Sequence, residues 1–218
     1  METLAATAFR TFSSLLVILA ASLSHAAGNP DAGQQKAAAC TACHGPDGNS
    51  LADMWPKLAG QLPDYLVKQM KDFKAGKRAD EQMSPQVANL AEADMPDIAA
   101  WFAAQAIRPG EGDKALRAKG EQLYLKGKGR PVPATACVGC HGPAGAGNKD
   151  WNTTWTKVPA VLAPGIGGQH AAYIEKQLKA YRDGTRSNDP ARVMREIARG
   201  LDDGEIKALA AYVATLKR

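Results

Sequence analysis

The sequence predicts an all-α fold made of two small helical domains that arose by tandem duplication. Apolar residues recur at helical spacing, for example at Ile206, Leu209 and Val213, while the strict alternation typical of β-strands is missing. A block of identical residues repeats at a constant offset of 108 residues, as from Tyr65 to Tyr173. A length of 218 residues allows one large domain or two small ones, and the repeat favours two.

The composition narrows the class of protein. Apolar residues make up 45% of the chain and charged residues 22%, which excludes a disordered chain and a multi-spanning membrane protein. Aromatic residues make up only 6%, and much of the apolar fraction is alanine, which buries little area per side chain. We therefore expect a large cofactor to fill part of the core.

Residues 1–26 are predicted to be a signal peptide. Arg10 lies near the start, an apolar run spans residues 15–23, and small residues flank a cleavage point before Ala27. An uncleaved anchor, which would hold the protein at the membrane surface, is the alternative because Glu2 and the single arginine make the charged region weak. The sequence does not decide between the two, but both imply export.

The duplication is clearest in the middle of each half. The residues that match at the constant offset are Gln61, Tyr65, Lys68, Gln69, Gly76 and Arg78 in the first half and Gln169, Tyr173, Lys176, Gln177, Gly184 and Arg186 in the second. Proline and glycine at residues 108–112 mark the boundary, which gives domains at 27–108 and 109–218. The second domain carries an insert within residues 144–163 that contains Trp151 and Trp155.

Local signals place the main helices. Pro63 opens and Gly76 closes a helix with Leu66, Met70 and Phe73 on an apolar stripe. The last helix follows a capping box formed by Asp202 and Glu205. Its counterpart near the end of the first domain carries Ile98, Trp101 and Phe102.

Each domain also carries one Cys-x-x-Cys-His motif, the attachment signal for c-type haem. The motif residues are Cys40, Cys43 and His44 in the first domain and Cys137, Cys140 and His141 in the second. On one helical turn, the two thiols reach the two vinyl groups of a porphyrin and the imidazole meets the iron. A zinc site and a thioredoxin-like dithiol are the alternatives; the first needs four ligands and the second a βαβ context that is missing here. The sequence therefore predicts two covalently bound haem c groups.

The other axial ligand of each iron is predicted to be a methionine. Met194 is the only methionine after the linker, and it lies seven residues before Leu201. Met83 lies at the same distance before Leu90, which favours it over the other methionines of the first domain. The remaining candidates are Met54, Met70 and Met95, of which Met70 is expected in the core.

Two further expectations concern the surroundings of the histidines. A backbone carbonyl near Pro56 or Pro164 could accept the Nδ1 hydrogen of the proximal histidine, although an ordinary loop proline explains both equally well. His170 is the only spare histidine of the mature chain and is expected at the surface, with a bis-histidine haem as the alternative.

These features resemble the diheme cytochrome c4 family. The resemblance rests on the two Cys-x-x-Cys-His-Gly motifs, on Gly-Gln-x-x-x-Tyr after each, on residues 119–124, and on a methionine before leucine and an acidic helix start in each half. It covers nearly the whole mature chain. It implies two class I cytochrome c domains related by a pseudo-twofold axis, haems near the domain interface, His/Met ligation of both irons, and electron delivery in the periplasm toward a terminal oxidase.

The charge is uneven between the domains. Residues 27–108 carry 8 basic and 10 acidic side chains, whereas residues 109–218 carry 18 and 11. A basic face can steer docking onto an acidic redox partner, but Arg192, Arg195 and Arg199 also fit a solvated helix face. Nucleic acid is not an expected partner of an exported haem protein.

The sequence thus predicts a periplasmic electron carrier rather than an enzyme. Expected donors are a cytochrome bc1-type complex or a dehydrogenase, and the expected acceptor is a terminal oxidase. One alternative is the cytochrome subunit of a dehydrogenase that acts on a sulfur compound or an alcohol. The other is a diheme peroxidase, which needs an open iron position and is disfavoured by two methionines at matching places.

Overall fold

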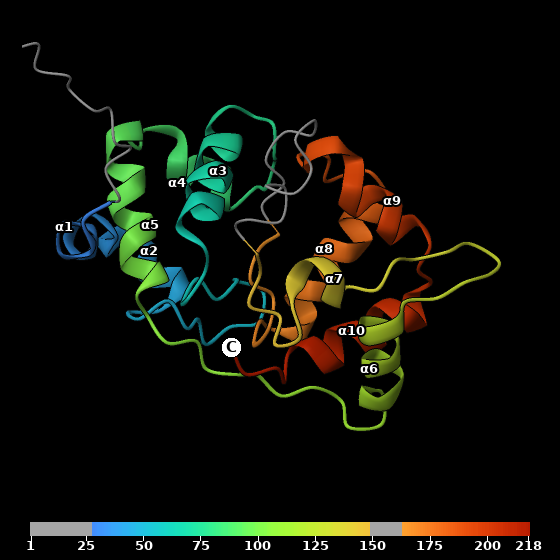
Figure 1. Ribbon diagram of the computed structural model, residues 1–218. Coiled ribbons are helices and arrows are strands. Elements are labelled where there is room, and N and C mark those ends of the chain that lie inside the picture. Colours follow the sequence, from blue (N-terminus) through green and yellow to red (C-terminus); the bar gives the residue numbers. More distant parts are fainter. Residues whose placement is uncertain (1–27, 149–162) are drawn as a thin grey trace, which may run out of the picture.

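A computed structural model describes residues 28–148 and 163–218, and this part of the chain forms helices and no β-strand beyond two isolated bridges. The helices gather into two units that lie side by side, with the C-terminus between them (Figure 1). The predicted all-α fold is confirmed. The signal segment 1–26 and the insert residues Trp151 and Trp155 lie outside the described residues.

In the described residues the α-helices follow the same order in both units, whereas the 3₁₀ helix comes after the fourth α-helix in the first unit and before it in the second. The first unit contains α1 (Pro30–Lys36), α2 (Ala38–His44), α3 (Pro63–Lys74), α4 (Met83–Ala88), the short 3₁₀ helix η1 (Glu92–Asp94) and α5 (Met95–Ala103). The second contains α6 (Arg117–Lys126), α7 (Val138–His141), α8 (Ala171–Arg182), the 3₁₀ helix η2 (Pro190–Arg192), α9 (Val193–Arg199) and α10 (Asp203–Val213). Helices α3 and α8 occupy the positions that the 108-residue offset matches.

The first and last helices of each unit cross at a glycine. Helix α1 packs on α5, and α6 packs on α10. A Cβ atom added to Gly33 would lie 2.0 Å from the Asp97 carbonyl oxygen, and one added to Gly120 would lie 2.0 Å from the Ala208 carbonyl oxygen. The two backbones therefore approach so closely that only glycine fits at the crossing.

The local helix signals behave as predicted. Helix α3 begins at Pro63, and the chain leaves it through Gly76, whose φ of +69° suits glycine. In α10, the Asp202 side chain accepts from the Glu205 backbone N–H at 2.8 Å, and the Glu205 carboxylate accepts from the Asp202 N–H at 2.9 Å. Both bonds satisfy backbone donors that a helix start leaves unpaired.

Each unit has a small apolar core beneath these helices. Met95, Ile98 and Phe102 are fully buried in the first core, and Tyr124 and Ile206 in the second. No helix within the described ranges is long and apolar enough to cross a membrane.

Replacing Gly120 by alanine is expected to lower the free energy of unfolding by about 1–3 kcal/mol because the added methyl group overpacks the crossing with α10. Helix propensity alone predicts that the same substitution raises the free energy of unfolding, since alanine in a helix is favoured over glycine by about 1 kcal/mol. Urea unfolding followed by circular dichroism measures the change. Gly129→Ala is the control, because a Cβ atom there meets nothing within 4 Å. A Gly120→Ala protein as stable as wild type would contradict the close crossing.

Candidate haem-binding cavity

A cavity of about 640 Å³ lies between the two units and is lined from both. All eight residues expected to hold the two haems line it, namely Cys40, Cys43, His44, Met83, Cys137, Cys140, His141 and Met194. Helices α2 and α7 bring the motif residues to the wall, and Met83 and Met194 sit in the first turns of α4 and α9. The fold therefore brings together what the repeat predicted from distant parts of the chain.

The four cysteines form no disulfide and are partly buried. Burial raises the pKa of the Cys40 and Cys140 thiols, and it raises the pKa of Cys137 to about 11. The thiols thus stand unpaired in the cavity wall, two from each unit, as covalent attachment of two porphyrins requires.

Both motif histidines are held by a proline carbonyl. The Nδ1 atom of His44 lies 2.8 Å from the Pro56 carbonyl oxygen, and that of His141 lies 2.8 Å from the Pro164 carbonyl oxygen. Burial lowers the pKa of both rings and favours the neutral form, in which Nδ1 donates to the carbonyl. The lone pair then lies on Nε2, the atom that is left to coordinate iron. The prediction that a carbonyl at Pro56 and at Pro164 accepts a hydrogen bond from the motif histidine is confirmed.

The methionines of the described residues differ in how deeply they are buried and in whether they line the cavity. Met95 is fully buried and Met70 is 8% exposed, and both belong to the core of the first unit, whereas Met54 is 54% exposed. Met83 and Met194 are partly buried at the cavity in equivalent helix starts. The expectation that Met70 is a core residue is confirmed.

The expectation that His170 is a surface residue is wrong. Its Nε2 atom lies 3.0 Å from the Ser50 carbonyl oxygen and 2.9 Å from the Ser50 hydroxyl, so the ring bridges the two units. Burial, followed by the nearby Lys57 cation, lowers the pKa of His170. A lone histidine in a sequence carries no sign of a contact with a residue 120 positions away.

The units are joined by two glutamine side chains in equivalent positions. Gln61 donates to the Gly165 carbonyl at 2.7 Å and accepts from the Gly165 N–H at 2.8 Å. Gln169 donates to the Lys57 carbonyl at 2.9 Å and accepts from the Lys57 N–H at 2.8 Å. Since Gly165 is the repeat equivalent of Lys57, the two pairs are related by a pseudo-twofold axis, and each resembles a short piece of β-ladder made by a side chain.

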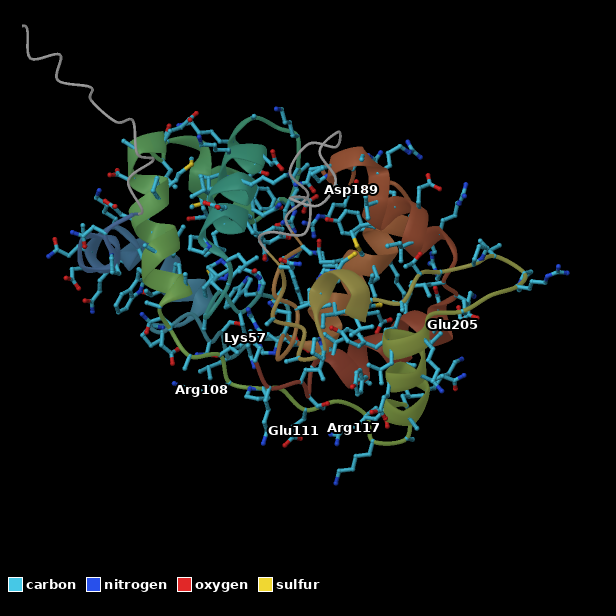
Figure 2. All side chains as sticks on the ribbon, viewed as in Figure 1. Lys57, Arg108, Glu111, Arg117, Asp189 and Glu205 are labelled. Atoms are coloured by element: carbon cyan, nitrogen blue, oxygen red, sulfur yellow. The ribbon has the colours of Figure 1, made fainter. Side chains whose placement is uncertain are left out.

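Lys57 breaks this symmetry because glycine stands at its equivalent position. Its ammonium group is buried and donates to the carbonyl oxygens of Arg108, at 2.5 Å, and Gly168, at 3.2 Å. Figure 2 shows Lys57 between the units, above the connecting segment that carries Arg108 and Glu111. Burial lowers the pKa of Lys57.

A second symmetric network links α3 and α8. The Arg78 guanidinium donates to Gln69 at 2.7 Å in its own unit and, across the interface, to Tyr173 and Gln177, each at 3.0 Å. Arg186 makes the equivalent bonds, to Gln177 at 2.7 Å and, across the interface, to Tyr65 at 3.0 Å and Gln69 at 3.2 Å.

Sequence reasoning missed the role of these residues, although the signal was present. The identities that revealed the duplication at Gln61, Tyr65, Gln69 and Arg78 are interface residues, whereas core positions such as Phe73 differ from their counterparts. In a pseudo-twofold interface, equivalent positions of the two units make the same contacts, so the same residue type is needed at both. In a core, equivalent positions need only side chains of similar volume.

Comparison with known proteins agrees with this geometry. The cytochrome c family model matches residues 30–105 and 118–217. Cytochrome c4 of Pseudomonas aeruginosa is 45% identical over 206 residues, with 93% of this chain and 96% of that protein covered. The thiosulfate dehydrogenase electron acceptor of Stutzerimonas stutzeri is 39% identical over 188 residues, which is 83% of this chain and 80% of the relative.

A solved structure has the same fold. The crystal structure of reduced recombinant cytochrome c4 from Pseudomonas stutzeri superposes with a TM-score of 0.78 at 42% identity, and the match covers 87% of this chain and all of that one. The donor set in the cavity fits the group this family carries, with two thiols and one Nε2-directed imidazole in each unit. The chain therefore belongs to the cytochrome c family, as a diheme cytochrome c4 that carries electrons on two covalently bound haem c groups.

Proposed function

We propose that this protein carries electrons one at a time in the periplasm, with one closed, His/Met-ligated haem in each domain. The observation that carries the proposal is a shared cavity to which both domains contribute a Cys-His motif and a methionine at a matching helix start. The domains are assigned to residues 27–108 and 109–218, a division that fits the two regions of the family match.

Different residues of the chain attach, ligate and orient each haem. The haem supplies an iron that alternates between the ferric and ferrous states. Cys40 and Cys43 hold the first haem covalently, and Cys137 and Cys140 the second. His44 and His141 are the proximal ligands, and the proline carbonyls fix the orientation of both rings. Met83 and Met194 complete the two sites, and a thioether ligand in a buried setting favours the ferrous form.

The proposed partners are redox proteins of the respiratory chain. A cytochrome bc1-type complex or a dehydrogenase would donate electrons, and a terminal oxidase would accept them. The dehydrogenase gains support from the relative named as a thiosulfate dehydrogenase electron acceptor, although that relative is less similar than cytochrome c4. The predicted signal peptide at residues 1–26 supports the periplasmic location.

The arginines of η2 and α9 form ion pairs, which weakens the case for a simple basic docking face. Arg195 pairs with Asp189 at 2.7 Å, and Arg199 pairs with Glu196 at 2.9 Å. Arg192 reaches the same Glu196 at 3.4 Å. The three arginines share two carboxylates, which leaves one positive charge in excess, so the pairs fit a solvated helix face and reduce its contribution to electrostatic steering.

Replacing Met83 or Met194 by alanine is expected to remove about half of the far-red sulfur-to-iron absorption band of the oxidised protein, because each substitution removes one of two thioether ligands. The matched control is Met54→Ala, which changes an exposed methionine of the same cavity wall and should leave the band intact. A band that survives Met83→Ala or Met194→Ala unchanged would show that the ligand of that domain is another residue.

Carbon monoxide distinguishes the carrier from a peroxidase. The reduced wild-type protein should give no carbon monoxide difference spectrum at neutral pH, because both irons are closed by methionine. The Met194→Ala protein should give a spectrum that corresponds to one haem. Carbon monoxide binding by the wild type at one equivalent would indicate an open iron and support the enzymatic alternative.

A further inference from the structure

One contact between the two units has no counterpart within the sequence repeat. Lys57 of the first unit donates to the Gly168 carbonyl of the second at 3.2 Å. At the offset of 108 residues, the position equivalent to Lys57 is Gly165. The position equivalent to Gly168 is Gly60, and residue 165 cannot bind its carbonyl because glycine has no side chain.

Arg218, from the segment that follows α10, binds that carbonyl instead. Its Nη1 donates to the Gly60 carbonyl at 2.6 Å and its Nη2 to the Ala59 carbonyl at 3.1 Å, both in the first unit. Its Nε donates to the Gly167 carbonyl of its own unit at 2.8 Å. One guanidinium thus joins the two units through three backbone oxygens, and the segment that carries it runs between the units in Figure 1.

The Arg218 guanidinium lies where a side chain of residue 165 would begin. A Cβ atom added to Gly165 would lie 2.0 Å from Nη1 of Arg218 and 2.8 Å from its Cζ. Burial lowers the pKa of Arg218 to about 10, so the group still carries its charge at neutral pH. The fold therefore keeps a cation at this place although the repeat position itself is glycine.

The carbonyls bound by Lys57 and Arg218 include those of two loops that orient the motif histidines. The first histidine-orienting loop, residues 56–61, contains the carbonyl that lies against Nδ1 of His44. The second, residues 164–169, contains the carbonyl that lies against Nδ1 of His141. The placement of the loops relative to each other therefore sets the separation of the two histidines.

We propose that Arg218 is a positioning residue that replaces the cation missing at residue 165 and, together with Lys57, clamps the two histidine-orienting loops to each other. The clamp keeps the loops, and with them the two haems, from moving apart. Its consequence for the haems rests on the placement given under Proposed function, whereas the clamp itself involves protein groups only. Charged donors suit this task because their hydrogen bonds are about twice as strong as those between neutral groups.

Amide hydrogen exchange of the intact diheme protein tests the clamp, because two backbone amides report on the contact between the units. The Lys57 N–H donates to Gln169 at 2.8 Å, and the Gly165 N–H donates to Gln61 at 2.8 Å, so both are bonded across the interface. Arg218→Gln should raise the exchange rate of both amides by about tenfold, as expected when hydrogen bonds from a charged group are lost.

Two amides bonded within one unit serve as the internal reference. The Ala104 N–H donates to a carbonyl four residues earlier, and so does the Ala214 N–H. Their exchange rates should stay within about twofold of wild type, since the opening is local to the interface. The matched control variant is Lys217→Gln, which removes the exposed cation next to Arg218 and should leave all four amides unchanged. An equal rise at all four amides in Arg218→Gln would show general loosening and overturn the clamp.

Two changes at Gly165 test the replacement from the other side. Gly165→Ala places a methyl group against the guanidinium and should raise exchange at the Lys57 amide, as Arg218→Gln does. Gly165→Lys added to Arg218→Gln supplies a cation at the position equivalent to Lys57 and should reverse most of that rise. No effect of Gly165→Ala, or no recovery in the double variant, would overturn the assignment of Arg218 as the replacement.

The oxidised spectrum, recorded first, separates this proposal from the haem assignment. If the wild-type protein lacks the sulfur-to-iron band, the proposed methionine ligands are wrong. If the band is present in wild type and variants while amide exchange at Lys57 and Gly165 stays unchanged in Arg218→Gln, only the clamp is wrong.

Discussion

The fold depends on a cavity that its own side chains do not fill. Each unit is a small domain with an alanine-rich sequence and few aromatic residues. A domain of this kind buries little apolar area and needs a further source of stability, such as a covalently bound cofactor. Each unit has a small apolar core, and a cavity of about 640 Å³ lies beside the two cores. The proposed haem sites lie in the wall of this cavity, so the two haem groups would supply the apolar contacts that the side chains leave unmade.

The duplicated domains share this cavity across a polar interface. Two glutamine amides bind backbone groups of the opposite unit, and two arginines interlock with tyrosine and glutamine of α3 and α8. Buried polar groups cost free energy unless they are satisfied, so such a network permits one relative placement of the domains and disfavours others. Fixing the domains in this way also fixes the spacing of the two redox sites.

Local signals in the sequence were enough to predict the parts of the structure that depend on near neighbours. Pro63, Gly76 and the capping box at Asp202 set helix ends through contacts a few residues away. The contacts of His170, Lys57 and Gln61 could not be predicted, because they join positions more than 100 residues apart on faces that helical periodicity does not describe. The exact repeat of polar residues was a usable signal, since equal residues on both sides are what a pseudo-twofold interface requires.

Peptide mass spectrometry tests the central claim most directly. After proteolysis of the purified protein, haem should be found covalently bound to two peptides, the one containing residues 40–44 and the one containing residues 137–141. This result would place one haem in each domain on the cysteines that line the shared cavity. Free thiols at either cysteine pair, or haem on a single peptide, would contradict the account.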